Sequence, residues 1–349
     1  MAEPLILAIE SSCDDTSAAV LRGRRVLSNV VAGQNVHEQY GGVVPELASR
    51  AHQSNMVPVV QQALRNAQTG ANQLQAIAFT QGPGLMGSLH VGVSFAKSMA
   101  MALGLPLLAV NHMQAHILAH FIAADDGEAE PQFPLLCLTV SGGHTQLVLL
   151  QNHHDMRIVG ETIDDAAGEA FDKAAKVLGL PYPGGPHLDR LAANGDAFKF
   201  NFNTPRLSGF DYSFSGLKTS LLYFLRDAMK ENPEFIHQER NNICASYQRT
   251  VVQYLLARME AAAKEYRVTN VCLAGGVSAN SELRKQFETL ADKNGWQAHI
   301  PPFEYCTDNA AMIGITAYYQ YLRGEFAPIT TAPLPSITWG KGDVILKRS

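Results

Sequence analysis

The sequence lacks the features that mark several classes of protein. Its five cysteines among 349 residues are scattered, with no zinc-ribbon spacing and no disulfide framework. No apolar run reaches membrane-spanning length, and the N-terminus has no charged region or cleavage site of a secretory signal. The net charge of -5 provides no overall basic field for nucleic acid. We therefore expect a cytoplasmic protein that does not contact membranes.

What the sequence does contain is a repeated pattern of apolar strands and small-residue turns. Apolar runs at 5–9 and 16–21 flank a polar turn at 10–15, and runs at 135–140 and 146–150 flank Ser141–Thr145. Each pair is followed by a strand, a glycine-containing loop and a helix, first at 76–103 and again at 270–293. This order predicts a duplicated α/β fold with two lobes facing a cleft. The acidic, polar stretch 123–131 is the expected linker between them.

A pair of histidines stands at the start of an expected helix after the buried strand 107–111. His112 and His116 are four residues apart, so their imidazoles lie on one helical face and can converge on a borderline metal. His120 extends the row by one turn. The alternative is that these histidines only form an ordinary polar face of the helix. The sequence does not favour a metalloprotease, because Met113 stands where that motif needs glutamate.

Carboxylates near two other turns are candidates for the same chemistry. Asp308 fits the N-cap of the final helix, and it also completes a two-histidine, one-carboxylate metal site if that helix folds back on the first lobe. The turn at 10–15 can present carboxylates and backbone N–H groups, although an ordinary hairpin explains it equally well. The glycine loop at 81–87 lacks the lysine of a phosphate-binding P-loop.

Nine motifs, taken in order, resemble one family over nearly the whole chain, from Ile6 to Arg323. They are ESSCDDTSAAV, GGVVPELASRAH, GPGLMGSLHVG, VNHMQAHILAH, VSGGHTQLV, IDDAAGEAFDKAAKVLGLPYPGG, SFSGLKT, AGGVSAN and CTDNAAMIG. The family is that of the bacterial tRNA N6-adenosine threonylcarbamoyltransferases (TsaD), once described as O-sialoglycoprotein endopeptidase-like glycoproteases. The resemblance implies duplicated ribonuclease-H-like lobes, as in actin, Hsp70 and sugar kinases (the ASKHA superfamily). We expect residues 1–124 with 306–349 in the first, metal-binding lobe and 132–305 in the second, adenylate-binding lobe.

The resemblance also implies an acyltransferase reaction. A threonylcarbamoyl group would pass from threonylcarbamoyl-adenylate to N6 of adenosine 37, in the anticodon loop of tRNAs that read ANN codons. One divalent metal per subunit, Fe²⁺ or Zn²⁺, would be held by His112, His116 and Asp308, which are catalytic residues together with Asp14. Asp14 is our candidate for positioning the attacking amine or accepting its proton. The adenylate, or another adenine nucleotide, would lie against a larger set of positions: Val140, Ser141, Gly142, Gly143, His144, Asp172, Gly185, Asp189 and Asn280.

Partners and departures from the family pattern follow from the same resemblance. It implies a TsaB-like paralogue, a TsaE-like ATPase and a TsaC-type enzyme that supplies the adenylate. Asp15 stands where many members have glutamate, and the tail at 332–341 lacks a common basic ending, which leaves the role of Asp15 and a tRNA contact in the tail open. The alternatives are a small-molecule O-carbamoyltransferase of the same fold, a non-catalytic scaffold subunit, and a sugar kinase or ATPase.

Overall fold

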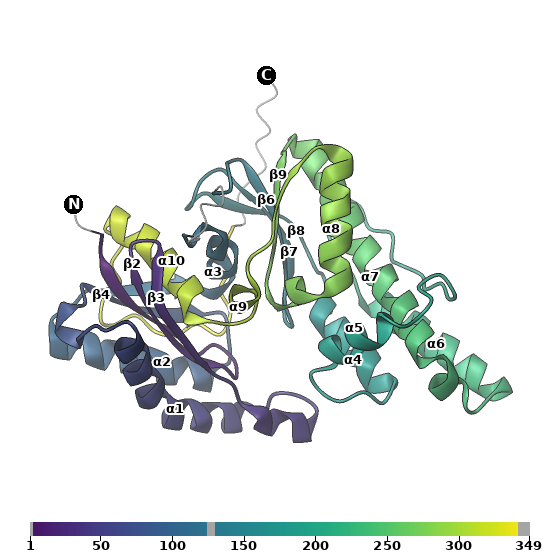
Figure 1. Ribbon diagram of the computed structural model, residues 1–349, viewed down its shortest axis with the longest axis horizontal. Coiled ribbons are helices and arrows are strands. Elements are labelled where there is room, and N and C mark those ends of the chain that lie inside the picture. Colours follow the sequence, from purple (N-terminus) through teal and green to yellow (C-terminus); the bar gives the residue numbers. More distant parts are fainter. Residues whose placement is uncertain (1–2, 124–129, 341–349) are drawn as a thin grey trace.

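Two five-stranded sheets of identical topology form the framework of the molecule (Figure 1). A computed structural model describes residues 3–123 and 130–340. The first sheet has the order β3-β2-β1-β4-β5, and the second has the order β10-β9-β6-β7-β8. In each, a central strand pairs antiparallel with the next strand along the chain and parallel with the strand on its other side. The duplicated α/β fold predicted from the sequence is therefore confirmed.

The strands are short and most of the central ones are buried. The first sheet contains β1 (Leu5–Glu10), β2 (Thr16–Arg22), β3 (Arg25–Ala32), β4 (Ala76–Gly82) and β5 (Leu107–Asn111). The second contains β6 (Leu135–Val140), β7 (Thr145–Leu150), β8 (Met156–Glu161), β9 (Asn270–Ala274) and β10 (Gln297–His299). β1, β6 and β7 are buried at every position, so they appear in the sequence as continuous apolar runs. The partly exposed edge strands β3, β8 and β10 give no such signal, and the sequence analysis missed them.

Helices cover the outer faces of both sheets, and others lie between the sheets. The first lobe has α1 (Pro45–Asn66), α2 (Met86–Leu103), α3 (His112–Leu118) and α10 (Ala310–Arg323). The second has α4 (Ala167–Val177), α5 (Gly184–Ala192), α6 (Ser215–Glu231), α7 (Phe235–Tyr266) and α8 (Ser281–Asn294), and α9 (Phe303–Cys306) leads back to the first. Short 3-10 turns occupy Asn35–Tyr40 (η1), Ala71–Gln73 (η2), Ala119–Phe121 (η3) and Gly276–Ala279 (η4). Helix α7 begins seven residues before the expected Asn242, because its first two turns are polar and only partly buried.

One hydrophobic core joins the two lobes. It contains the inner faces of β1 and β2, the inner faces of β6 and β9, and residues of α3 and α10 that lie between them (Figure 1). Because buried apolar residues from both sheets pack against α10, the C-terminal helix belongs structurally beside the N-terminal strands. The expected linker, 123–131, lies mostly outside the described residues, and the lobe boundaries remain a prediction.

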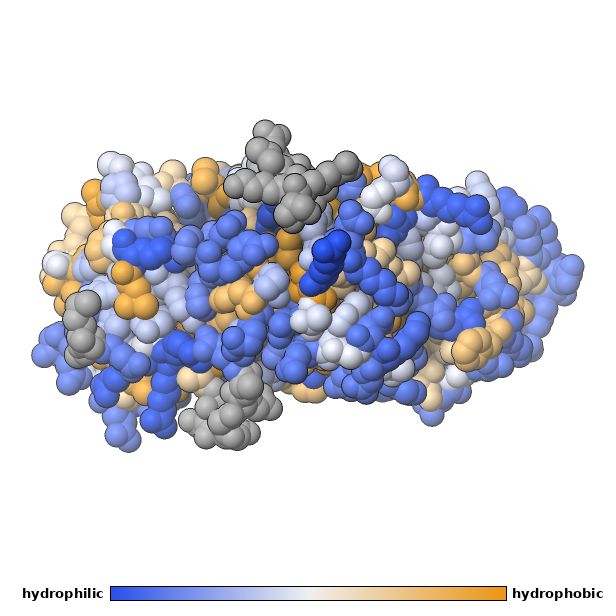
Figure 2. Space-filling view, turned by 90° about the horizontal axis from the view of Figure 1, so that it is seen from above, coloured by the Kyte–Doolittle hydropathy of each residue, from blue (hydrophilic) through white to orange (hydrophobic). Residues whose placement is uncertain are grey.

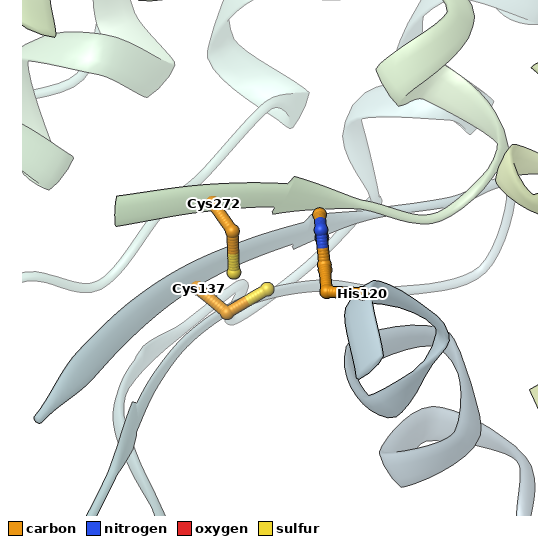
Figure 3. Close-up of side chains that lie close together, drawn as sticks. All are labelled: His120, Cys137 and Cys272. Atoms are coloured by element: carbon orange, nitrogen blue, oxygen red, sulfur yellow. The ribbon is translucent and has the colours of Figure 1, made fainter. Parts of the chain in front are cut away.

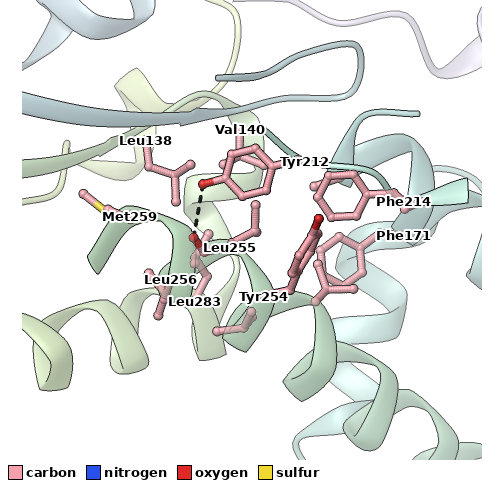
Figure 4. Packing of buried hydrophobic residues seen from close by; sticks show 14 of the residues in the cluster. Leu138, Val140, Phe171, Tyr212, Phe214, Tyr254, Leu255, Leu256, Met259 and Leu283 are labelled. Atoms are coloured by element: carbon pink, nitrogen blue, oxygen red, sulfur yellow. Dashed lines mark hydrogen bonds between the residues drawn. The ribbon is translucent and has the colours of Figure 1, made fainter. Parts of the chain in front are cut away.

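A second core lies on the outer face of the second sheet. Leu138 and Val140 of β6 pack there against Phe171, Tyr212 and the apolar face of α7 (Figure 4). The hydroxyl of Tyr212 donates a hydrogen bond to the carbonyl of Leu255 at 3.2 Å, which satisfies the one polar atom of this buried ring. This core holds the first turns of α4 and α5 in place.

The surface of the molecule is mixed in character. Seen from above, hydrophilic residues cover most of the visible face, with hydrophobic ones scattered between them (Figure 2). Over residues 3–123 and 130–340, none of the helices is both long enough and apolar enough to cross a lipid bilayer.

Candidate functional site

Two histidines and one aspartate meet at the junction of the lobes. The Nε2 atoms of His112 and His116 are 3.2 Å apart, and Oδ1 of Asp308 lies 3.4 Å from the first and 3.2 Å from the second. Both histidines are buried, and Asp308 is half-buried. The structure thus brings together the three residues that the sequence analysis grouped as metal ligands.

Helix capping explains how these side chains are positioned. The side chain of Asn111 accepts hydrogen bonds from the N–H groups of Met113 and Gln114, so α3 begins at His112 and places His116 one turn further on. Asp308 does not cap α10, contrary to one expectation. Asn309 does so by accepting from Met312 N at 3.0 Å, and the carboxylate of Asp308 faces the histidines.

His120 does not extend the histidine row. α3 ends at Leu118, and His120 lies in the following 3-10 turn. Its Nε2 atom donates to the carbonyl of Leu273 in the second lobe at 2.7 Å. The change from α to 3-10 geometry turns its ring away from the other two histidines, so a continued one-turn spacing was the wrong assumption.

The spacing of the three ligand atoms fits a divalent cation. Ligand atoms about 2.1 Å from a tetrahedral Zn²⁺ lie about 3.4 Å from one another. The observed separations of 3.2–3.4 Å match this value. Two imidazoles and one carboxylate suit Zn²⁺ or Fe²⁺. The triad is therefore a candidate site for either ion.

Glu10 supports the triad, and the sequence analysis did not find it. Its carboxylate is fully buried, and Oε2 lies 3.1 Å from Nδ1 of His112. The same carboxylate accepts hydrogen bonds from the Thr80 hydroxyl at 2.6 Å and from Ser12 N at 2.5 Å. A carboxylate that accepts a hydrogen bond from the second ring nitrogen of a metal-binding histidine fixes the tautomer and orientation of that histidine. The only sequence signal for this role is a glutamate directly after the apolar run 5–9.

The charged groups at this site strongly affect one another's pKa values. Burial alone lowers the pKa of His112, but the carboxylates of Asp308 and Glu10 outweigh it and raise that pKa well above its usual value. Burial raises the pKa of Asp308, and the two histidines more than reverse this, so the carboxyl stays ionised. The pocket between two carboxylates thus favours a positive charge, which a proton on His112 or a metal ion can supply.

Replacing Glu10 by glutamine is expected to weaken metal binding about 10–100-fold, because the His112 ring loses its charged acceptor. The measurement is the dissociation constant for Zn²⁺, obtained by competition with a chromophoric chelator. Glu46→Gln, at an exposed position of α1, is the matched control and should leave the constant unchanged. An unchanged constant in Glu10→Gln would show that Glu10 does not support the metal ligands.

A pocket in the second lobe collects five of the nine residues expected to hold an adenylate. Gly142, Asp172, Gly185, Asp189 and Asn280 line a cavity of about 470 Å³. Val140 ends β6, while Ser141, Gly143 and His144 belong to the turn between β6 and β7, and none of these four is among the lining residues. The lining also includes residues that the sequence analysis did not select: Gly168, Phe171, Tyr182, Pro183, Pro186, Gly276, Val277, Ala279 and Phe303.

The acidic residues of this pocket already hold its walls together. Oδ1 of Asp172 accepts the N–H groups of Gly184 and Gly185 at 2.8 and 3.1 Å, which fixes the start of α5. Asp189 accepts from both the N–H and the hydroxyl of Ser281 and from the side chain of Gln248. Gln248, a buried polar residue in α7, therefore supports the pocket, and its polarity among the apolar residues of the buried face of that helix is the signal that could have revealed it.

Close backbone contacts leave no room for a side chain at one wall of the pocket. A Cβ atom on Gly168 would lie 2.5 Å from the carbonyl oxygen of Ser141 and 2.8 Å from Cα of Gly142. Glycine at position 168 therefore allows the first turn of α4 to touch the β6–β7 turn, and the shape of the pocket depends on this contact.

Residues at the pocket and residues of the first lobe lie within electrostatic reach of one another. Burial and the charges of His112 and His116 together lower the pKa of His144 to about 4. On the other side, burial and the charge of Asp14 together raise the pKa of Tyr182 to about 12. The β6–β7 turn is therefore close to the triad, and the acidic turn of the first lobe is close to the pocket.

Asp15 in that acidic turn carries a strongly perturbed carboxyl. Burial, followed by the charge of Asp14, raises its pKa from 3.8 to about 7. The folded protein thus holds the protonated form more tightly than the unfolded chain does, so stability falls as the pH rises from about 4 to about 7. The half-buried Asp14 beside it is the residue we selected as a catalytic candidate.

Asp15→Asn is expected to raise the Tm of the metal-free protein by several degrees at pH 8 and by clearly less at pH 5, where Asp15 is protonated in the folded protein. Thermal melts followed by circular dichroism in the presence of chelator measure both values. Asp155→Asn, at an exposed position, should shift neither melt. Equal shifts of the Asp15 variant at both pH values would contradict a raised pKa.

The sequence matches a known protein family over most of its length. A family model described as tRNA N6-adenosine threonylcarbamoyltransferase (TsaD) matches residues 25–315. A relative from Porphyromonas gingivalis with that name is 56% identical over 335 residues, which cover 96% of this chain and 98% of the relative. One from Christiangramia forsetii with the same name is 58% identical over 322 residues, covering 92% and 94%.

Solved structures share the fold at low sequence identity. HypF from T. kodakarensis superposes with a TM-score of 0.63 at 15% identity, over 95% of this chain and 50% of HypF. Full-length HypF in a phosphate- and nucleotide-bound form gives a TM-score of 0.60 at 13% identity, over 92% of this chain and 47% of HypF. The chain thus spans about half the length of HypF, and the likeness concerns the fold alone.

Proposed function

The chain belongs to the TsaD family of tRNA N6-adenosine threonylcarbamoyltransferases. From this premise we propose what the triad and the pocket each contribute to the reaction. The activity is the transfer of a threonylcarbamoyl group to N6 of an adenosine in tRNA. In our proposal the donor is threonylcarbamoyl-adenylate and the acceptor is adenosine 37 of tRNAs that read ANN codons. The observation that carries the proposal is that the same molecule has both the His112, His116 and Asp308 triad and a nucleotide-sized pocket.

The pocket of the second lobe would bind the adenylate moiety of the donor. Its cavity of about 470 Å³ falls within the usual size range of small-molecule sites, and the aromatic rings of Phe171, Tyr182 and Phe303 give it apolar walls. N–H groups of the β6–β7 turn, which includes Gly142 and Gly143, would receive the phosphate. Asp172 and Asp189 would act mainly by holding α5 and α8 in place, because both already accept hydrogen bonds there.

The triad would hold one divalent cation, Fe²⁺ or Zn²⁺, beside the phosphate end of this pocket. Such an ion, when bound, stabilises the negative charge that develops on a departing phosphate. Glu10 would orient His112, and the two buried histidines would remain neutral once they share the cation. His144, held neutral by burial, would add no competing charge between the triad and the pocket.

The acidic turn of the first lobe would handle the proton of the incoming amine. N6 of adenosine attacks the carbamoyl carbon, and the bond between that carbon and the phosphate oxygen breaks. Adenosine monophosphate leaves, and one proton of the attacking amine must be taken up. Asp14 would position that amine or accept the proton. An adenosine in a single-stranded loop can be turned out toward such a site.

We further propose that the protein works with partners. A TsaC-type enzyme would supply the adenylate, and a TsaB-like paralogue and a TsaE-like ATPase would assemble with this chain. The net charge of -5 provides no overall attraction for the polyanionic tRNA, which favours a binding surface shared with partners over binding by this chain alone.

The alternative functions predict different results. A small-molecule carbamoyltransferase would not require tRNA, and membership of a tRNA-modifying family favours a tRNA acceptor. A scaffold subunit would not need a complete ligand set, and the described residues include all three members of the triad. A kinase or ATPase would turn over ATP alone.

The deciding experiment supplies unmodified tRNA, threonine, bicarbonate, ATP and the three partner proteins, and reads modified adenosine by mass spectrometry. We expect product at adenosine 37, and no product when that position is guanosine. A second reaction with preformed adenylate and no TsaC-type enzyme should also give product. Folded, metal-loaded protein that modifies no tRNA in either reaction would overturn the proposal.

A further inference from the structure

A second group of metal-binding side chains lies in the core that joins the lobes. His120, Cys137 and Cys272 each bring one ligand atom to within 4.8 Å of the other two. Both cysteines are buried and free, and His120 is half-buried. Figure 3 shows the two sulfur atoms turned toward one another beside the His120 ring. The reaction described above uses none of these three residues.

The sheet itself places the two cysteines together. Cys137 of β6 and Cys272 of β9 are direct partners in a parallel pair, so their side chains leave the sheet on the same face. On the next strand, β10, His299 is the direct partner of Cys272. Three neighbouring strands thus present two thiols and an imidazole in one row across the sheet.

His120 approaches this row from the other lobe in a form suited to bind a cation. A carbonyl oxygen can only accept a hydrogen bond, so the contact of Nε2 with the carbonyl of Leu273 at 2.7 Å fixes the proton on Nε2. The lone pair of the neutral ring is then on Nδ1. Metal-binding histidines very often donate their other ring N–H to a backbone carbonyl in this way.

The cluster also has a route to solvent. His120 and His299 line a cavity of about 450 Å³ between the lobes. Its wall carries the carboxylate of Glu288 and the ion pair between Arg24 and Glu130. A carboxylate in the wall favours a cation, and a metal site requires an entry path.

We propose that His120, Cys137 and Cys272 form a second metal site, selective for a thiol-binding cation such as Zn²⁺ and distinct from the His112, His116 and Asp308 triad. Two thiolates and one imidazole are ligands that Zn²⁺ prefers. Binding converts both thiols to thiolates and releases two protons to solvent, so the charges balance. The ion would connect η3, directly after the helix that carries the triad, to the sheet of the second lobe.

Small buried cysteines often fill a core without binding anything, so the experiment must detect metal–sulfur bonds. Co²⁺ is titrated into metal-free full-length His112→Ala/His116→Ala protein, kept reduced with a phosphine. We expect about one ion per chain and the near-ultraviolet charge-transfer band that cobalt–thiolate bonds produce. The triad has only nitrogen and oxygen ligands, so it cannot give this band.

Matched variants in the same background test the assignment. Cys137→Ser and Cys272→Ser should each abolish or strongly reduce the band, whereas Cys244→Ser, at a buried free cysteine of α7, should retain it. If the serine variants fail to fold by circular dichroism, His120→Gln, which leaves both thiols in place, should lower the affinity at least tenfold. A folded parent without the band, or a band of undiminished intensity in folded Cys272→Ser, would overturn the proposal.

Discussion

His112→Ala is expected to reduce the rate of tRNA modification by about 10³-fold or more. The substitution removes one of three ligand atoms that lie 3.2–3.4 Å apart, and the remaining pair cannot hold a divalent cation with comparable affinity. It also leaves the fully buried carboxylate of Glu10 without its histidine partner. Both changes slow the transfer. The cation no longer stabilises the charge of the departing phosphate, and the uncompensated carboxylate adds a negative charge at the site.

The rate of adenosine modification under single-turnover conditions, together with the bound metal per chain, provides the measurement. His90→Ala is the matched control, because His90 lies exposed on α2 and is expected to leave both quantities unchanged. A His112→Ala protein that has lost the metal of the triad yet modifies tRNA at the normal rate would show that the cation has no part in the transfer.

Gly168→Ala is expected to reduce kcat/KM for the adenylate donor by about 10²-fold, the cost of displacing a binding group by about 1 Å. The new Cβ atom would meet backbone on both sides, at Ser141 O and Gly142 Cα, and neither can rotate out of the way. The β6–β7 turn must therefore move away from α4, and the wall of the pocket moves with it. The fold should survive, since alanine favours the helix more than glycine does.

Gly216→Ala is a close control for this change. Gly216 is also the second residue of its helix, α6, but its Cβ atom would lie 3.4 Å from the side chain of Pro205, an ordinary contact. We expect normal kinetics and a normal melt for this variant. If both variants have the same kcat/KM, the close contact at Gly168 does not control the shape of the pocket.

Buried strands and short motifs were predictable because their signal is local. β1, β6 and β7 are buried throughout and mostly apolar, since helices or a second layer cover both of their faces, and so the sequence alone identified them. The histidine pair was predictable for a similar reason: a spacing of four residues on one helix determines which face two side chains share. The order of these signals, repeated along the chain, also predicted the duplication of the fold.

Edge strands and supporting residues were not predictable in this way. β3, β8 and β10 have partly exposed, mixed patterns that resemble loops. Glu10, Gln248 and Phe303 contribute to the sites through neighbours 32 or more positions away in the sequence, or through the wall of a cavity. No local pattern encodes such contacts.

The sequence by itself therefore determined the buried strands, the order in which the duplicated elements follow one another, and the ligand types at the start of α3. Only the tertiary structure decided that Asp308 turns toward the histidines instead of capping α10, that Glu10 supports His112, and that His120 faces the other lobe beside Cys137 and Cys272. The physical reason is that helix periodicity and burial act between near neighbours. The direction of a side chain at an element's end depends on the packing of segments distant along the chain, here through the core shared by both lobes.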